Sequence, residues 1–261
     1  MTTYLDEILL AHRARAAADG RALDAIVEAA AAAPPPRGFT AALRASSDRI
    51  AVIAEVKRRS PSKGALAADL DPAETAAAYV EGGAACLSVL TDEEHFGGSA
   101  ADLQAARAAV DVPVLRKDFT VDPRDVADAR AMGADAVLLI VAALDDGELR
   151  DLHELAVELG LDVLVEVHDE PELDRALAVG ADLIGVNQRD LRTFEVDHER
   201  AVRIGQAMPA GVVRVAESGI RGPDDAAALA DAGFHAVLVG ESVVTAGDRA
   251  ASVAGLRAPR R

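Results

Sequence analysis

The apolar residues of this chain gather in eight short runs, separated by amphipathic stretches of helical length. Four runs share one pattern, in which a helix end meets a glycine and a short apolar strand follows. These are "EGGAACLSVL" (81–90), "AMGADAVLLI" (131–140), "AVGADLIGV" (179–187) and "DAGFHAVLVG" (231–240). The other four are "RIAVIAEV" (49–56), "VPVLRK" (112–117), "LDVLVEVH" (161–168) and "GVVRVAES" (211–218). Nearly continuous apolar runs are typical of parallel strands covered on both faces.

Helix start signals fill the gaps between these strands. Asp71-Pro72 and Asp122-Pro123 each place a capping residue before a first-turn proline, and Ser99 with Asp102 resembles a capping box. Eight alternating strands and helices predict a (β/α)₈ TIM barrel, whose usual size is about 250 residues. A doubly wound open sheet is the alternative, but the first strand lacks the G-x-G-x-x-G turn of its dinucleotide-binding form.

Residues before the first strand predict extra N-terminal helices. Residues 1–33 are rich in alanine and suit one or two helices, and "APPPRG" (33–38) cannot continue a helix, so it predicts a linker. We therefore expect one barrel domain over residues 1–261, with 1–48 as an N-terminal helical extension.

Composition narrows the class of protein. Half of the 261 residues are apolar and the formal net charge is −17, which argues against nucleic-acid binding but still allows a local cationic pocket for a small anion. The single cysteine, Cys86, excludes an internal disulfide and a cysteine-based zinc site. No signal peptide or membrane-spanning run is evident, so we expect a cytoplasmic protein without membrane or nucleic-acid partners.

Polar residues mark the carboxyl ends of six predicted strands, where barrel enzymes carry their chemistry. They are Glu55, Lys57, Lys117, Glu166, Asn187, Arg189, Glu217, Ser218, Gly219, Gly240, Glu241 and Ser242. Because side chains alternate along a strand, Glu55 and Lys57 share one face, and the same alternation turns Glu166 into the barrel. Arg214 would point toward the helices, where its role is open.

Lysine usage supports a chemical role for two of these positions. The chain has only three lysines, Lys57, Lys63 and Lys117, and the first and last lie at inward strand ends. Arginine stays charged at any working pH, whereas a lysine can give up its proton. Lys63 falls in the loop after the first strand, where a surface role is expected.

Glycines after the last two strands predict a phosphate site. Barrel enzymes often bind phosphate with these loops, since backbone amides can donate to an anion where no side chain crowds the approach. Gly219 and Gly240, together with Ser60 after the first strand, outline such a cradle.

Seven segments in order resemble indole-3-glycerol phosphate synthase, a tryptophan-pathway enzyme, over about residues 50–245. They are "IAEVKRRSPSKG", "PVLRKDFTVDP", "ADAVLLIVAAL", "LDVLVEVHDE", "LIGVNQRDLRTFEVD", "AESGIRGPDD" and "AVLVGESVV". The resemblance implies a carboxy-lyase that cyclises, decarboxylates and dehydrates the small anion 1-(2-carboxyphenylamino)-1-deoxyribulose 5-phosphate, with no metal and no cofactor. Contacts with other tryptophan-pathway enzymes stay open.

The resemblance also implies roles for individual residues. Lys117 would be the general acid at the substrate carbonyl, Glu166 the second acid–base group, and Lys57 the partner of the substrate carboxylate. The remaining catalytic and binding positions would be Glu55, Glu217, Asn187, Arg189 and Ser218. Phosphate would be bound at Ser60, Gly219, Gly240, Glu241 and Ser242, and the aromatic ring would pack on Phe119 and Phe96. His95 stands where a bulky aromatic residue is expected before Phe96.

Three other functions compete with this one. A phosphoribosylanthranilate isomerase would need a cysteine–aspartate pair, but Cys86 falls within a strand and suits a small buried residue. An aldolase would form a Schiff base on Lys117. A non-enzymatic phosphate-binding barrel would bind its ligand without needing five inward ionisable groups.

Overall fold

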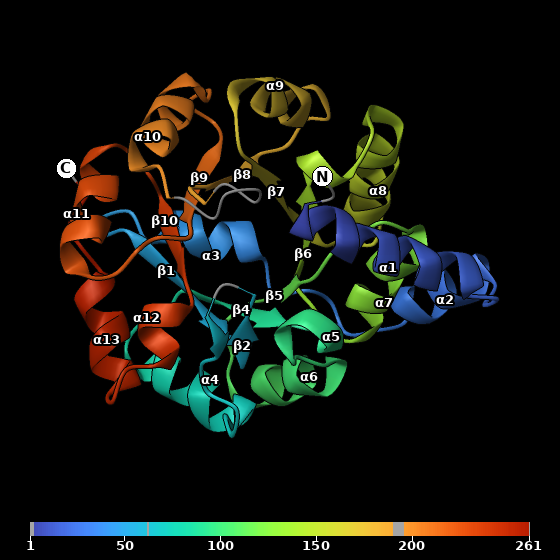
Figure 1. Ribbon diagram of the computed structural model, residues 1–261, viewed down its shortest axis with the longest axis horizontal. Helices are drawn as coiled ribbons and strands as arrows, with labels where there is room; N and C mark the ends of the chain where they lie inside the picture. Colours follow the sequence, from blue (N-terminus) through green and yellow to red (C-terminus); the bar gives the residue numbers. More distant parts are fainter. Residues whose placement is uncertain (1–2, 62, 190–195, 261) are drawn as a thin grey trace.

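Eight parallel strands close into a barrel in the order β1-β10-β9-β8-β7-β6-β5-β4 (Figure 1). The computed structural model describes residues 3–61, 63–189 and 196–260, so Ser62 and residues 190–195 of the "LIGVNQRDLRTFEVD" segment lie outside the described residues. The strands are β1 (Ala51–Val56), β4 (Cys86–Leu90), β5 (Val114–Lys117), β6 (Ala136–Ile140), β7 (Asp162–Val167), β8 (Leu183–Asn187), β9 (Val213–Glu217) and β10 (Ala236–Val239).

Closure decides between the two predicted architectures. β1 pairs with β10 on one side, Ala51 opposite Ala236, and with β4 on the other, Ile53 opposite Cys86. Each of the eight apolar runs contains one barrel strand, so the (β/α)₈ prediction is confirmed and the open-sheet alternative is wrong.

Helices surround the barrel and begin at the predicted caps. The main ones are α4 (Pro72–Glu81), α6 (Ala100–Ala109), α7 (Pro123–Ala131), α8 (Asp146–Glu158), α9 (Glu170–Ala178), α10 (His198–Ala207), α11 (Pro223–Asp231) and α13 (Arg249–Leu256). Shorter elements are α5 (Glu93–Phe96), α12 (Glu241–Val244), the 3₁₀ turn η1 (Val141–Ala143) and a hairpin of β2 (Arg59–Ser60) and β3 (Gly64–Ala65). The Asp71, Ser99 and Asp122 side chains accept first-turn amide hydrogen bonds, as capping requires. Within the described residues, no helix has both the length and the apolar character needed to cross a bilayer.

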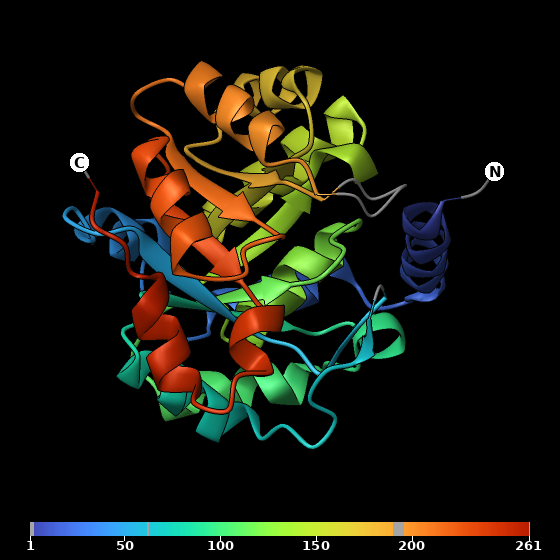
Figure 2. The ribbon, with the colours of Figure 1, turned by 60° about the vertical axis from the view of Figure 1, so that its left-hand side comes forward.

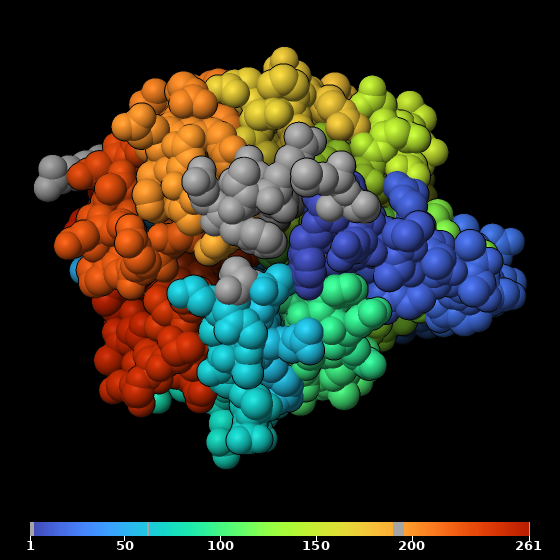
Figure 3. Space-filling model, viewed as in Figure 1, coloured from blue at the N-terminus to red at the C-terminus, as the bar shows by residue number. Residues whose placement is uncertain are grey.

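Three N-terminal helices precede the barrel, and two of them lie at its opposite ends. The three are α1 (Tyr4–Ala18), α2 (Leu23–Ala31) and α3 (Phe39–Ala45), and residues 33–38 join the last two without helix, as the proline run predicts. Phe39 of α3 is fully buried, and the Thr40 amide donates to Asp162 Oδ2 (3.1 Å) at the start of β7, so α3 caps the amino ends of the strands. α1 lies at the opposite end, at the rim of the hollow in Figure 3.

Arg214 lies on the helix side of β9, as strand alternation predicts. Its Nη2 donates to the Met208 carbonyl at the end of α10 (2.8 Å). The side chain therefore satisfies a helix end that would otherwise lack a donor.

Candidate active site

A cavity of about 690 Å³ opens at the carboxyl ends of the strands. All of the positions singled out from sequence line it, namely Glu55, Lys57, Ser60, Phe96, Lys117, Phe119, Glu166, Asn187, Arg189, Glu217, Ser218, Gly219, Gly240, Glu241 and Ser242. Seven segments far apart along the chain therefore converge on one space large enough for a drug-sized ligand.

Glu55 and Lys57 form a close pair on one wall of the cavity. Both point inward from β1, and Lys57 Nζ lies 2.6 Å from Glu55 Oε1. A side chain at position 240 would intrude here, because a Cβ on Gly240 would lie 2.5 Å from Glu55 Oε1 and 2.9 Å from Lys57 Nζ. Gly240 thus makes room for this pair, a role distinct from the phosphate contact that the sequence indicated.

A lysine and two glutamates form the floor of the cavity. Lys117 Nζ lies 3.5 Å from Glu166 Oε2 and 3.9 Å from Glu217 Oε2, and both carboxylates are only 2% exposed. Gly185 on β8 is required here, since a Cβ at that position would overlap Glu217 Oε1. Gly185 lies two residues before Asn187 on β8, so the two share a face, but nothing local in the sequence indicates why this position must be glycine.

Burial and charge push the pKa values of these three groups apart. Burial alone would lower the pKa of Lys117, but the charges of Glu166, Glu217 and Glu55 outweigh it and raise that pKa. Burial, followed by the charge of Glu166, raises the pKa of Glu217 well above its usual range. The floor therefore holds the Lys117 ammonium beside a carboxyl group that keeps its proton to higher pH than an ordinary glutamate.

The pKa of Glu166 is shifted in the opposite direction, downward. Burial would raise its pKa, but the charges of Lys117 and His168 and a hydrogen bond from Asn187 lower it. Asn187 Nδ2 donates to Glu166 Oε1 (3.0 Å), and the amide of Arg189 donates to Asn187 Oδ1 (3.1 Å), which fixes the orientation of the side-chain amide. Glu166 is therefore an ionised base beside the Lys117 ammonium.

Backbone strain marks the other end of the cavity. Ser218 has φ 66° and is the one non-glycine residue with positive φ in the described part of the chain, and Gly219 follows with φ 72°. Gln188 Nε2 holds this turn by donating to the Ser218 carbonyl (2.9 Å). Strain of this kind costs about 1–3 kcal/mol and is common at ligand sites.

Polar groups near this turn suit an anion. The Ser60 hydroxyl is buried and has no hydrogen-bond partner among the described atoms, whereas Ser242 Oγ donates to the Ile220 carbonyl (3.1 Å). Arg221 and Lys63 also line the cavity, and Lys63 Nζ lies 3.3 Å from Glu241 Oε1. The sequence analysis expected Lys63 at the surface and did not consider Arg221. It did not predict that the loops after β1 and β9 bring both residues to the rim of the cavity.

An aromatic wall faces the Glu55–Lys57 pair. The ring centroids of Phe96 and Phe119 lie 6.2 Å apart, and Tyr4, Leu5 and Ile8 of α1 complete the lining. Sequence reasoning missed the α1 residues. The spacing of four between Tyr4 and Ile8, continued at His12, is the available signal that one face of α1 is buried.

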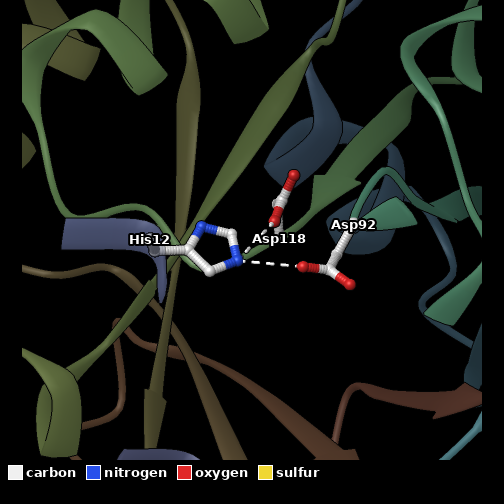
Figure 4. A group of neighbouring side chains, drawn as sticks. All are labelled: His12, Asp92 and Asp118. Atoms are coloured by element: carbon white, nitrogen blue, oxygen red, sulfur yellow. Dashed lines mark hydrogen bonds and ion pairs between the residues drawn. The ribbon is translucent and has the colours of Figure 1, made fainter. Parts of the chain in front are cut away.

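His12, Asp92 and Asp118 fasten α1 to the barrel (Figure 4). His12 Nε2 lies 2.9 Å from Asp92 Oδ2 and 3.8 Å from Asp118 Oδ1. Both carboxylates have further partners, since Asp92 Oδ1 accepts from the His95 amide (2.6 Å) and Asp118 Oδ2 from Arg116 Nη2 (2.9 Å). This cluster ties α1 to the segments that carry the two phenylalanines.

His95 stands where the family resemblance implies a bulky aromatic residue. Its ring stands edge-on to Tyr4 of α1, with centroids 5.9 Å apart. Imidazole thus supplies a ring contact between the loop after β4 and α1.

Comparison with known proteins gives a consistent result. The family model described as indole-3-glycerol phosphate synthase matches residues 5–256. Proteins of that name from Mycolicibacterium vanbaalenii (56% identical over 97% of this chain and 93% of theirs) and a Parafrankia species (55% over 97% and 94%) are similar along nearly their whole length. Among solved structures, a thiamine phosphate pyrophosphorylase from Pyrococcus furiosus aligns with a TM-score of 0.60 at 20% identity, covering 79% of this chain and 93% of that one, which supports the barrel fold alone.

Proposed function

Because this chain belongs to the indole-3-glycerol phosphate synthase family, we propose that it converts 1-(2-carboxyphenylamino)-1-deoxyribulose 5-phosphate into indole-3-glycerol phosphate. The observation that carries this proposal is the floor of the cavity, where Lys117 Nζ lies 3.5 Å from Glu166 Oε2 and 3.9 Å from Glu217 Oε2. The reaction needs a proton donor at a ketone and a base afterwards, and this arrangement offers both.

Ring closure is the first step. The ring carbon that bears the carboxylate attacks the ketone carbon, and Lys117 gives its proton to the ketone oxygen as the new bond forms. The carboxylate then leaves as carbon dioxide and returns its bonding electrons to the ring. In this proposal Lys57 pairs with the carboxylate until it departs, and Glu55 holds the ammonium in place at 2.6 Å.

Dehydration completes the indole. The new hydroxyl takes a proton from the Lys57 ammonium, whose carboxylate partner has departed, and leaves as water, and the neighbouring carbon loses a proton, which Glu166 accepts. Glu217 holds a substrate hydroxyl by a hydrogen bond, while Asn187 and Arg189 orient the groups around Glu166. General acid–base steps of this kind typically contribute a factor of about 10² to 10⁴ each.

The two ends of the cavity suit the two ends of the substrate. The aromatic ring would pack between Phe96 and Phe119, and the phosphate would lie at Ser60, Gly219 and Gly240 with Ser218, Glu241 and Ser242 around it. The Ser60 hydroxyl, which has no hydrogen-bond partner among the described atoms, and the cations Lys63 and Arg221 support binding of the phosphate at this end of the cavity. Since both substrate and product are phosphorylated intermediates, we expect the enzyme to work in the cytoplasm.

The alternative functions are less well supported. An isomerase would require a reactive cysteine, but Cys86 is fully buried and burial raises its pKa. A Schiff-base aldolase would require a neutral amine, whereas the surrounding carboxylates raise the pKa of Lys117.

A fluorimetric assay for indole-3-glycerol phosphate with purified protein tests the proposal directly. We expect turnover without added metal or cofactor, together with no isomerisation of phosphoribosylanthranilate. Absence of indole formation from a folded sample, or a borohydride-trapped adduct on Lys117, would contradict it.

A further inference from the structure

A buried histidine lies behind Glu166, outside the cavity lining. His168 follows the end of β7, and its side chain is 12% exposed. Nδ1 lies 3.0 Å from Glu172 Oε2, and Nε2 lies 3.5 Å from Glu166 Oε1. Among the described atoms Nε2 has no hydrogen-bond partner, and its charged neighbour is the Glu166 carboxylate.

The start of α9 fixes this histidine. Asp169 caps the helix by accepting from the Glu172 amide (2.9 Å), and this turns the Glu172 side chain back toward His168. Glu172 Oε2 also accepts from the His168 backbone amide (2.7 Å), so the carboxylate and the imidazole have one mutual orientation. Both ring nitrogens then face carboxylate oxygens, which accept hydrogen bonds. Only the doubly protonated imidazolium has an N–H group on each nitrogen and can donate to both carboxylates.

We propose that His168 is a positioning residue for Glu166. As an imidazolium, His168 keeps the Glu166 carboxylate ionised and aimed at Lys117. This inference rests on the proposed function, in which Glu166 must begin the dehydration step as a base. The histidine touches neither the substrate cavity nor the reacting atoms, and it acts only through Glu166.

The charges around His168 agree with this assignment. Burial would lower the pKa of His168, but the hydrogen bond that its ring donates to Glu172 and the charges of Glu166 and Glu172 outweigh burial and raise the pKa, while Arg200 of α10 opposes them. On its other side Glu166 faces Lys117 and, through that lysine, Glu217. Removing the imidazolium leaves Glu166 with one cationic neighbour fewer, so its pKa rises.

The pH dependence of kcat distinguishes positioning from a merely structural role. In His168→Gln we expect the acid limb of the kcat profile to move upward by about one pH unit, which is about a tenfold loss on that limb, with much less loss at the alkaline plateau. Glu172→Gln should move the limb the same way by a smaller amount. His153→Gln, which replaces a histidine of α8 outside the cavity lining, serves as the control and should leave the profile in place.

Two further readouts separate the possible failures. A uniform loss of rate with an unshifted limb would overturn the inference while leaving the proposed function intact, and an inactive wild type would instead overturn the function. Imidazole NMR of the folded wild type gives an answer independent of turnover and of whether the variants fold. We expect His168 to be an imidazolium at pH 7 and to titrate at lower pH in Glu172→Gln, and a neutral ring at pH 7 would refute the assignment.

Discussion

Replacing Gly240 by alanine should reduce activity far more than stability. Gly240 has φ −117°, which alanine adopts freely, so the backbone adds no strain. The added methyl group meets two side-chain ends, Glu55 Oε1 at 2.5 Å and Lys57 Nζ at 2.9 Å. The cost therefore falls on the pair that we assign to substrate binding.

The displacement can be estimated from these distances. Ordinary contact begins at 3.4 Å, so Glu55 Oε1 must retreat by about 0.9 Å and Lys57 Nζ by about 0.5 Å. A misplacement of about 1 Å near reacting groups can lower the rate about 10²-fold. Because both atoms end flexible side chains, we expect the free energy of unfolding to fall by no more than about 1 kcal/mol, the lower end for overpacking.

Steady-state kcat/KM and urea unfolding of Gly240→Ala measure the two effects separately. Gly247→Ala is the matched control, because Gly247 is exposed and a Cβ there would meet no atom within 4 Å. Activity within threefold of wild type would show that the pair tolerates the methyl group and would refute the close-packing argument. A large loss of stability would instead locate the strain in the backbone.

Three other substitutions test individual assignments. Lys117→Arg keeps the charge but cannot release a proton, so kcat should fall by about 10² or more, and near-normal turnover would exclude the acid role. Lys57→Ala should raise KM for the carboxylated substrate about tenfold or more, because a charge-assisted contact contributes about 1.5–3 kcal/mol, and an unchanged KM would contradict the pairing. Glu217→Gln should raise the Tm relative to wild type at pH 7 but not at pH 4. The raised pKa of Glu217 makes the folded wild type lose stability as pH rises above the unfolded value of about 4.3, and a glutamine has no proton to lose. An equal Tm change at both pH values would argue against that shift.

Local patterns were sufficient to predict the barrel and one face of each catalytic strand. The apolar runs, four of them with a glycine cap ahead, predicted all eight strands, and a period of two turned Glu55, Lys57 and Glu166 inward. Both signals depend on neighbours within a few residues, which a single sequence contains in full.

Features that depend on distant contacts could not be predicted. His12 meets Asp92 across 80 residues, so nothing near α1 in the sequence shows that this helix borders the cavity. Gly185 must be glycine because of Glu217, a residue on the next strand. The raised pKa of Glu217 likewise follows from burial and from the charge of Glu166, which only the closed barrel brings together.

The placement of the two chain ends determines where this protein can be joined to another. Tyr4 lines the cavity mouth, whereas Pro259 forms a bridge with Arg49 ahead of β1, at the far end of the barrel. Figure 2 shows α1 (dark blue) and the last described residues (dark red) on opposite sides. A purification tag, surface linker or second domain attached after residue 260 would leave substrate entry clear, and the same segment attached ahead of α1 would hang beside the entrance.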